Sequence, residues 1–486
     1  MQTRNIVPLL IGGKDVVLPS DGNDTLFVPN PDVAGSKQWR AQGATQDLCV
    51  EAIKSCVGAF EGWKRTSPSE RRRLFNRLAQ LLRERSKELA TLIEEELCCS
   101  PAWTAINVEE TIAMAEQIAA ITTSGVLSGV VPEVRAPDAH AVVFKEPLGV
   151  ILGIAPWNSP AILGLRAVAA PVAAGNCAIL KGSELSPRTH YFIARLFRDS
   201  CFPHGVVNFL VHRPEDAQTV FETLISHPAI RKCNFTGSTP VGRHIATRAA
   251  QFLKPVLLEL GGKNFVIVLD DANLSSAADM ILEGALLNTG QICMSTDIVL
   301  VSTKTRPLLC QTLREKIETA SSTFVTRVVN SKSNVRIRAL LEDAAAKGAS
   351  IFPPLVPPGS VRPENATLIE GLTNDMEFWR QESFGPVVGV ATYADIDEAI
   401  NTVNDSEYGL SAAVFTQSSL EAMELARRLD VGAVHVNGPT VHDEATLPHG
   451  GFKSSGWGRF GGHWAFDEFT HTKTIIVNAH RPEAVQ

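Results

Sequence analysis

From residue 149 onward, short apolar strands alternate with helical segments, and this alternation constrains the fold more than any other feature of the chain. Strands that are apolar throughout and joined by helical crossovers are typical of parallel sheets covered on both faces. Because two such series follow each other, the sequence predicts an α/β protein with two doubly wound parallel-sheet lobes. The predicted strands and helices lie at 149–155, 162–174, 177–181, 189–201, 206–211, 217–226 and 232–235 in the first series, and at 264–269, 280–287, 297–301, 387–392, 396–404, 411–415, 420–429 and 433–437 in the second.

Residues 130–144 stand outside both series and predict a β-hairpin arm. Pro132 and Pro137 interrupt this segment, and the segment 473–477 near the C-terminus is also rich in β-branched residues. The two segments can pair with each other. Strand edges of this kind have to be covered, so the arm is a candidate for contact with a second subunit.

The composition is that of a globular protein, and it excludes several classes of function. The chain has 486 residues and a net charge of −7, so nucleic acid is not expected as its main partner. No apolar run is long enough to span a membrane, and the N-terminal segment lacks the pattern of a signal peptide. The nine cysteines are scattered without a CxxC pair, which argues against a disulfide framework or a metal site. We therefore expect a cytoplasmic enzyme in a reducing compartment.

Two segments place a reactive side chain next to a glycine turn. Glu259 ends an apolar strand and precedes Gly261 and Gly262. A carboxylate there is partly desolvated, which suits a general base, although a satisfied salt bridge is an equally good interpretation. Cys293 follows Gly290 and an apolar helix. On this segment alone a buried core cysteine is the more usual interpretation, and a nucleophile is the alternative.

Two other segments place polar groups at the ends of predicted strands. After Phe235 the chain runs through Gly237 and Ser238 into a helix, and the free N–H groups of such a helix start suit a pyrophosphate. Asn158 follows another strand, and its amide can donate to an oxyanion. When each segment is read alone, an ordinary turn is the simpler interpretation.

Taken together and in this order, these segments resemble the motifs of the aldehyde dehydrogenase superfamily. One such motif can arise by chance, whereas six in order hardly can. The resemblance runs from about residue 8 to the C-terminus. The motifs are Pro156-Trp157-Asn158, Lys181-Gly182-Ser183-Glu184, Phe235-Thr236-Gly237-Ser238-Thr239, Glu259-Leu260-Gly261-Gly262-Lys263, Gly290-Gln291-Ile292-Cys293 and Glu382-Ser383-Phe384-Gly385-Pro386.

The resemblance implies a catalytic role for three residues. Cys293 resembles the nucleophile, whose thiolate attacks the aldehyde carbonyl to give a thiohemiacetal. The side-chain amide of Asn158 and the backbone N–H of Cys293 resemble the oxyanion hole. Loss of a hydride to the nicotinamide leaves a thioester, and Glu259 resembles the base that activates water to release the acid.

The resemblance also implies NAD as the cofactor. Lys181 and Glu184 match the residues that hold the adenosine ribose hydroxyls, and a carboxylate there repels the 2′-phosphate of NADP. Gly237, Ser238 and Gly242 match the pyrophosphate turn. With the nicotinamide-ribose end included, the positions expected to bind NAD are Ile154, Ala155, Pro156, Trp157, Lys181, Ser183, Glu184, Gly237, Ser238, Thr239, Val241, Gly242, Glu382 and Phe384.

A closer resemblance is to the branch that acts on aromatic aldehydes, the salicylaldehyde and vanillin dehydrogenases. It rests on the amino-acid sequences of residues 162–167, 292–296 and 436–444. Arg166 lies about two helical turns after Asn158, so both can face one tunnel. A guanidinium there suits a phenolate, carboxylate or hydroxyl of the substrate, and the alternative is an ion pair with a nearby acid. The expected substrate contacts are Arg166, Met294 and His449.

Three features depart from the family pattern. About a dozen residues of a connecting loop are missing between Ser321–Val325 and Val329, which a surface connection tolerates better than a strand does. His449 stands where a phenylalanine usually lines the site, so we expect a more polar tunnel. Phe265 replaces a proline at a strand start, where the change matters less.

The resemblance finally implies a domain division and an assembly. Residues 1–129 and 145–260 are expected to form a Rossmann-like NAD-binding domain, and 261–455 the catalytic domain. The segments 130–144 and 470–486 are expected to form an oligomerisation element that pairs across subunits in a homodimer or a dimer of dimers.

Other functions stay open beside the oxidation of an aromatic aldehyde. Two alternatives are a non-catalytic NAD-binding relative and an acylating dehydrogenase that transfers the acyl group of the thioester to coenzyme A. The retained Glu259 favours water over coenzyme A as the acceptor. Catabolism of aromatic compounds and tailoring of secondary metabolites fit the sequence equally well.

Overall fold

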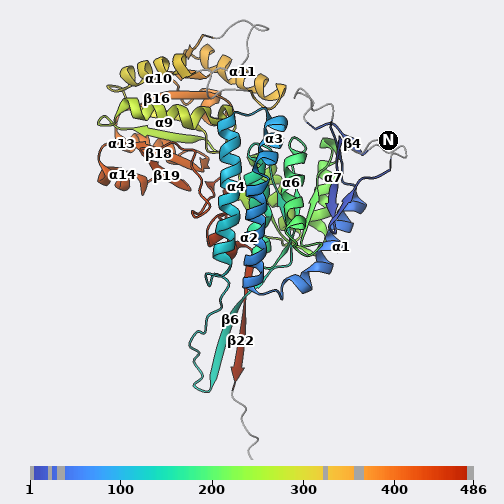
Figure 1. Cartoon of the computed structure of the whole chain (residues 1–486). Coiled ribbons are helices and arrows are strands. Elements are labelled where there is room, and N and C mark those ends of the chain that lie inside the picture. Colours follow the sequence, from blue (N-terminus) through green and yellow to red (C-terminus); the bar gives the residue numbers. More distant parts are fainter. Residues whose placement is uncertain (1–4, 20–24, 30–38, 321–326, 355–365, 479–486) are drawn as a thin grey trace, which may run out of the picture.

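Figure 1 shows two α/β lobes and a long two-stranded ribbon that projects from them. The structure is a computed structural model, and it describes residues 5–19, 25–29, 39–320, 327–354 and 366–478. The shortened connection near Ser321–Val325 lies outside the described residues. None of the helices in these ranges is long and apolar enough to cross a membrane.

The first lobe is built on an eight-stranded sheet in the order β21-β11-β10-β7-β8-β9-β2-β3. Its five central strands are parallel, as the sequence predicts. The predicted parallel sheet is thus confirmed, and at its edges β21, β2 and β3 pair antiparallel, which the sequence analysis did not predict. These edge strands have two or three residues, too few to show a periodic pattern. The strands are β2 (Leu9–Ile11), β3 (Lys14–Val16), β7 (Val150–Ile154), β8 (Cys177–Lys181), β9 (Val207–Leu210), β10 (Ile230–Thr236), β11 (Val256–Glu259) and β21 (Gly456–Trp457).

Helix α5 (Pro160–Ala173) is the central helix of this lobe, and all of its residues are buried. Its sequence is apolar all round because α4, α6, α15 and the sheet surround it. Helices α2 and α4 pack against each other and are seen side by side in Figure 1. The other helices of the lobe are α1 (Gln46–Trp63), α2 (Pro68–Glu84), α3 (Ser86–Leu97), α4 (Pro101–Thr122), α6 (Pro187–Asp199), η3 (Pro214–Asp216), α7 (Ala217–Ser226), α8 (Thr239–Gln251) and α15 (Trp464–Glu468).

The second lobe contains a seven-stranded sheet in the order β14-β15-β16-β13-β12-β18-β19. All its pairs are parallel except the one between β14 and β15 at one edge. The predicted second series of strands and helices is confirmed, with ends that shift by a few residues. The elements are β12 (Asn264–Val268), α9 (Leu274–Leu286), β13 (Thr296–Ser302), α10 (Arg306–Ala320), α11 (Ser331–Ala346), β14 (Ser350–Phe352), β15 (Thr367–Glu370), α12 (Glu377–Arg380), β16 (Val387–Tyr393), α13 (Ile396–Asn404), β18 (Ser411–Phe415), α14 (Ser419–Ala426) and β19 (Ala433–Val436).

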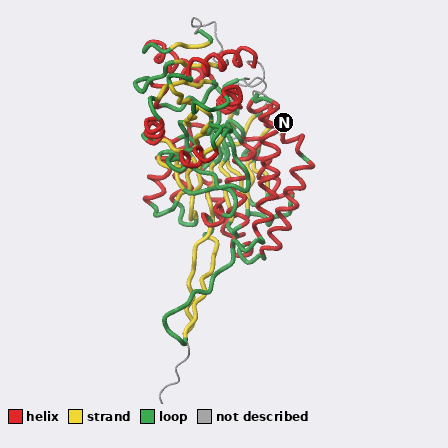
Figure 2. The backbone as a smooth tube through the Cα atoms, turned by 90° about the vertical axis from the view of Figure 1, so that its left-hand side faces the viewer, coloured by secondary structure: helices red, strands yellow, loops and turns green. Residues whose placement is uncertain are grey.

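The ribbon consists of β6 (Ala139–Pro147) and β22 (Thr470–Asn478), which pair antiparallel over nine residues each. Figure 2 shows the two strands as yellow traces side by side below the lobes. The predicted pairing of 473–477 with the arm is confirmed. The predicted hairpin over 130–144 is wrong in its extent, because only the bridge between Val130 and Val143 joins its two halves. The prolines at 132 and 137 keep the first half out of the ladder.

Five short strands complete the described fold. A small sheet joins β1, β5 and β4, and a two-stranded sheet joins β17 and β20. These strands are β1 (Ile6–Val7), β4 (Leu26–Phe27), β5 (Arg40–Gln42), β17 (Tyr408–Gly409) and β20 (Phe452–Lys453).

Candidate active site

Cys293 lies in the loop between η4 (Leu287–Gly290) and β13. Three successive residues ending at Gly290 have left-handed φ angles and turn the chain before the cysteine. A Cβ at Gly290 would clash with the carbonyl of Gly385, so only glycine fits there. The side chain of Asn264 donates to the carbonyl oxygen of Cys293 at 2.9 Å. This hydrogen bond fixes the backbone that carries the thiol.

Glu259 is the last residue of β11, and only 1% of it is exposed. Both carboxylate oxygens lack a hydrogen-bond partner within the described residues. The Nε2 atom of the His449 ring lies 3.6 Å from Oε1. No lysine or arginine of the described chain pairs with Glu259, so the interpretation as a satisfied salt bridge is wrong. Both oxygens of this buried carboxylate are instead open to a hydrogen-bond donor.

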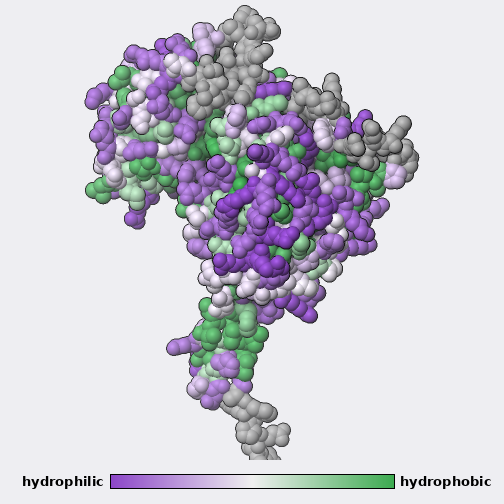
Figure 3. Space-filling view, viewed as in Figure 1, coloured by the Kyte–Doolittle hydropathy of each residue, from purple (hydrophilic) through white to green (hydrophobic). Residues whose placement is uncertain are grey.

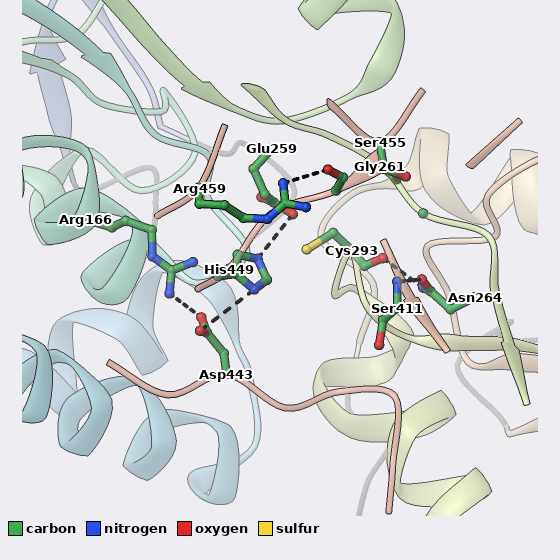
Figure 4. A network of polar contacts seen from close by, with 12 residues as sticks. Arg166, Glu259, Gly261, Asn264, Cys293, Ser411, Asp443, His449, Ser455 and Arg459 are labelled. Atoms are coloured by element: carbon green, nitrogen blue, oxygen red, sulfur yellow. Dashed lines mark hydrogen bonds and ion pairs between the residues drawn. The ribbon is translucent and has the colours of Figure 1, made fainter. Parts of the chain in front are cut away.

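The thiol of Cys293 lies against this carboxylate. Its Sγ, a carboxylate oxygen of Glu259 and a ring nitrogen of His449 are all within 4.8 Å of one another (Figure 4). Burial raises the pKa of the Cys293 thiol well above its ordinary value, and the negative charge of Glu259 raises it further. The positive charge of Arg166 acts in the opposite direction. The resting thiol is therefore protonated, with a proton acceptor beside it.

Asn158 follows β7 and reaches the Cys293 loop. Its side-chain Nδ2 donates to the backbone carbonyl of Gln291 at 3.0 Å. The backbone carbonyl of Asn158 accepts from the indole Nε1 of Trp103 at 3.0 Å. In the described part of the chain, neither the second amide hydrogen of Asn158 nor the backbone N–H of Cys293 is engaged. Both are available to an oxygen bound at the thiol.

Two cavities meet at these residues. A tunnel of about 760 Å³ and a cleft of about 890 Å³ share three residues in their walls, namely Asn158, Glu259 and Cys293. A molecule in the tunnel and a molecule in the cleft can therefore both reach the sulfur. Each volume is within the range of ordinary ligand sites.

The cleft is lined by most of the positions predicted to bind the cofactor. These are Ile154, Ala155, Pro156, Trp157, Lys181, Ser183, Glu184, Gly237, Ser238, Val241, Glu382 and Phe384. Two predicted positions do not line it. Thr239 donates to the carbonyl of Ser454 at 3.3 Å, and Gly242 packs against Leu260 so closely that a Cβ would clash. Gly242 thus serves the packing of α8 on the segment after Glu259.

The two ends of the cleft differ in their polar groups. At one end partial burial of Lys181 lowers the pKa of its ammonium group, while the charge of Glu184 opposes that shift. At the other end burial and the charge of Asp297 raise the pKa of Glu382 to about 8. The ring of Phe384 meets that of Trp157 edge to face at 5.8 Å. Between the ends, the N-terminal N–H groups of α8 follow Ser238, whose side chain does not cap them.

The tunnel is lined by Arg166, Met294 and His449, as the sequence predicts. The guanidinium of Arg166 is bound to the carboxylate of Asp443 (Figure 4). Of the two interpretations of Arg166, the structure therefore shows the ion pair with a nearby acid. Arg166 lowers the pKa of Asp443 to about 2 against the effect of burial. The Nε of Arg166 has no partner within the described residues, and the group still forms part of the wall. The ring of His449 forms part of the tunnel wall, and the more polar tunnel stays a prediction.

Several wall residues were missed by the sequence analysis. Helix α4 supplies Trp103 and further apolar side chains to the tunnel, although it carries no motif. Asp443 lies in a segment that supported the resemblance, but no partner was assigned to it. His212, Phe221 and Arg336 line the cleft and lie outside the motifs, so only the assembled fold identifies them.

Comparison with known proteins agrees with this geometry. Residues 18–475 match the sequence profile of the "Aldehyde dehydrogenase family". A vanillin dehydrogenase from a Pseudomonas species is 41% identical over 478 residues, which cover 97% of this chain and 98% of that protein. The crystal structure of a salicylaldehyde dehydrogenase from Pseudomonas putida, complexed with salicylaldehyde, superposes with a TM-score of 0.93 at 34% identity and covers 99% of this chain and 100% of that one. A betaine aldehyde dehydrogenase from Staphylococcus aureus in complex with NAD+ has a TM-score of 0.91 at 27% identity, with 99% and 96% covered.

Proposed function

The chain belongs to the aldehyde dehydrogenase family, and from that premise we propose that it oxidises an aromatic aldehyde to the carboxylic acid with NAD+ and water. The observation that carries the proposal is the meeting of two cavities at one half-buried thiol, beside a buried carboxylate that has no hydrogen-bond partner among the described residues. One cavity suits the aldehyde and the other the cofactor. Of the three residues shared by the two walls, Cys293 is the one that carries a nucleophile.

In the first half of the reaction Cys293 attacks the aldehyde carbon. Glu259 takes the thiol proton, since its free oxygens lie beside the sulfur. A carbon–sulfur bond forms, and the carbonyl oxygen becomes an alkoxide. The free amide hydrogen of Asn158 and the backbone N–H of Cys293 donate to that oxygen, which lowers the energy of the charge as it develops.

In the second half Glu259 acts on water. NAD+ held in the cleft would supply the hydride acceptor for oxidation of the thiohemiacetal to a thioester on Cys293. Glu259 first releases the thiol proton to solvent. It then removes a proton from a water molecule as the water oxygen attacks the thioester carbon, and the thiolate of Cys293 leaves and takes that proton. The acid departs through the tunnel, and the thiol is restored.

The cleft fits a dinucleotide. Its volume of about 890 Å³ accepts a ligand of that size, and the uncapped start of α8 offers N–H groups to a pyrophosphate. Lys181 and Glu184 would hold the ribose hydroxyls of the adenosine half, and Glu382 with Phe384 the nicotinamide half. The carboxylate of Glu184 favours NAD over NADP, because it would repel a 2′-phosphate.

The tunnel fits an aromatic ring with a polar substituent. Apolar side chains of Trp103, Leu163 and Val441 line it together with the polar Arg166 and His449. A ring can stack on the apolar walls while its hydroxyl meets the polar group. Similar proteins carry the names vanillin and salicylaldehyde dehydrogenase, and both of those aldehydes have a hydroxyl on the ring.

We also propose a homodimer or dimer of dimers in the cytoplasm. The ribbon carries exposed apolar side chains at Phe144, Ile475, Ile476 and Val477, and Figure 3 shows it as a largely hydrophobic surface. A second subunit would cover this surface and the open strand edges. The nine free cysteines support the proposal of a reducing compartment such as the cytoplasm.

Domain roles follow from the same division of the chain. We assign cofactor binding to residues 1–129 and 145–260, chemistry to 261–455, and subunit contact to the ribbon. The short β21 returns from the C-terminal part to the first sheet and pairs with β11, next to Glu259.

A single assay separates this proposal from its alternatives. Purified protein is incubated with NAD+ and benzaldehyde, vanillin or salicylaldehyde, with and without coenzyme A, while the absorbance of reduced nicotinamide is followed. The proposal expects steady turnover to the free acid without coenzyme A. Turnover that requires coenzyme A would identify an acylating dehydrogenase, and NAD+ binding without turnover would identify a non-catalytic relative.

A further inference from the structure

We propose that Cys293, Glu259 and His449 form a binding site for a thiophilic divalent cation of the Zn²⁺ type, and that bound cation reversibly blocks the nucleophile. The binding does not depend on the proposed function, whereas the blocking of catalysis rests on it. The three residues come from distant segments of the chain. No metal-ligand spacing in the sequence could therefore have indicated the site.

The three side chains offer the donor set that Zn²⁺ prefers. They supply one sulfur, one imidazole nitrogen and one carboxylate oxygen, and these atoms lie within 4.8 Å of one another. Zinc–ligand bonds of 2.0–2.3 Å imply a spacing of about 3.3–3.7 Å between ligands around a tetrahedral ion. The observed 3.6 Å between His449 Nε2 and Glu259 Oε1 is within that range. Small side-chain movements would bring the sulfur to the same spacing.

Glu259 gives an independent indication that a ligand belongs here. It is 99% buried, and neither carboxylate oxygen has a partner among the described residues. A buried carboxylate without a donor is costly. A cation between Glu259 and the thiol would provide the missing charge, and the adjoining tunnel and cleft leave room for a water molecule as the fourth ligand.

The far side of the imidazole is arranged as it is in metal sites. His449 turns Nε2 toward Glu259, while its Nδ1 faces Oδ1 of Asp443 at 3.8 Å. Figure 4 shows the chain of contacts from Arg166 through Asp443 and His449 to Glu259. A carboxylate behind a metal-binding histidine orients the ring and strengthens its nitrogen as a ligand. Arg166 holds that carboxylate in place.

The local charge also favours a cation. Glu259 and Asp443 are acidic, and Arg166 is the one arginine or lysine in the wall of the tunnel as the structure describes it. Its charge is already engaged by Asp443. A divalent ion that enters from the tunnel therefore meets a site whose remaining charge is negative.

Direct binding of Zn²⁺ to the whole protein tests the site. Protein treated with EDTA and then dialysed is titrated with Zn²⁺ by calorimetry, and Co²⁺ is used in parallel because a cobalt–thiolate bond gives a charge-transfer band. We expect one ion per chain, a thiolate band and loss of that band in Cys293→Ser. His449→Phe should weaken binding by more than about 100-fold and Asp443→Asn by about 10–100-fold.

His442→Phe is the matched control. His442 is in the same wall, but it is half-exposed and paired with Glu444, so its loss should leave the affinity for Zn²⁺ unchanged. Circular dichroism and NAD+ binding establish that each variant is folded. Equal affinity of wild type and His449→Phe, or binding that persists in Cys293→Ser, would overturn the proposal.

The inhibitory effect is measured separately. Zn²⁺ should stop turnover at one equivalent, EDTA should restore it, and His449→Phe should need at least tenfold more Zn²⁺ for the same inhibition. Stoichiometric binding by a protein with no dehydrogenase activity would contradict the proposed function and leave the cation site standing. An active enzyme that binds no Zn²⁺ would contradict the cation site alone.

Discussion

The guanidinium of Arg166 and the carboxylate of Asp443 form an ion pair in the wall of the tunnel. Arg166 belongs to α5 of the first lobe, and Asp443 lies in the segment that follows β19 of the second. The pair thus joins the two lobes beside the thiol. It also means that a substrate meets a guanidinium whose charge is largely compensated.

Replacement of Arg166 by leucine should reduce the preference for hydroxylated aryl aldehydes. An apolar pocket discriminates by only about 1–3 kcal/mol per methylene, whereas an unmatched polar group costs more when it is buried. We expect the ratio of kcat/KM between salicylaldehyde and a short alkyl aldehyde to fall about tenfold. The double variant Arg166→Leu/Asp443→Asn separates loss of the guanidinium from the effect of a stranded carboxylate.

His449 can mask part of that loss, since it offers a second polar contact in the same wall. The comparison is therefore repeated in a His449→Phe background. An unchanged ratio in both backgrounds would make Arg166 a structural residue and would remove the support for an aromatic substrate. NAD+ affinity should stay constant throughout, because Arg166 does not line the cleft.

The thiol of Cys293 should react slowly at neutral pH in the free protein. Burial and the charge of Glu259 raise its pKa well above the ordinary value, and only the thiolate is alkylated. Below a raised pKa the thiolate fraction grows about tenfold per pH unit, so the rate of alkylation by iodoacetamide should keep rising through pH 9 without a plateau. The measurement uses EDTA-treated protein and mass spectrometry of the modified peptide.

Arg166→Leu supplies the internal comparison for this pH dependence. Arg166 opposes the rise in the Cys293 pKa, so its removal should slow alkylation further at every pH below the plateau. A plateau near pH 7 in the wild type would show that the thiol is instead activated at rest.

Lys263→Met should destabilise the second lobe. The ammonium group of Lys263 is buried, and it donates to Asp297 Oδ1 at 2.9 Å and lies over the ring of Phe378 at 3.7 Å. Removal of one partner strands a buried charge, which costs about 3–5 kcal/mol. Urea denaturation should show this loss in the free energy of unfolding. The double variant Lys263→Met/Asp297→Asn should recover part of the lost free energy. A Lys263→Met variant as stable as the wild type would show that the ion pair does not stabilise the lobe.

The ribbon should determine the oligomeric state. Ile476 is 58% exposed on β22, and a charge there would oppose burial in a subunit interface. Ile476→Arg should shift the protein toward monomer in light scattering at micromolar concentration. Thr472→Arg places the same charge at a polar position of the strand and is the matched control. A wild type that is already monomeric and fully active would refute the assembly.

The sequence predicted most strands inside the two sheets, because most lie in a short, mainly apolar run that is followed by a helical pattern. It missed β2, β3, β14 and β21, which are too short to carry a period, and the four-residue β15. The arm at 130–144 was over-interpreted, because a run of β-branched residues was given more weight than its two prolines. The strand that pairs with β6 is the distant β22, as the β-branched residues at 473–477 had indicated.

The site was predictable where a residue lay in a motif and unpredictable where it lay only in the fold. Cys293, Glu259 and Asn158 were named from the sequence, and the structure brings them to one point between two cavities. Asp443, the partner of Arg166, was not named from the sequence, because the two residues are 277 positions apart in the chain. Contacts across two lobes depend on how the lobes pack, which local patterns do not encode.

The central claim is that Cys293 carries the acyl group and Glu259 is needed to release it. Glu259→Gln protein is incubated with NAD+ and benzaldehyde, and its intact mass and peptide masses are measured, with Cys293→Ala as the control. The account predicts up to one equivalent of reduced nicotinamide, formed slowly because the variant also lacks the acceptor of the thiol proton, then a stall, with a benzoyl group on Cys293 and none in the control. Steady turnover by Glu259→Gln, or a stalled acyl group on any other residue, would contradict it.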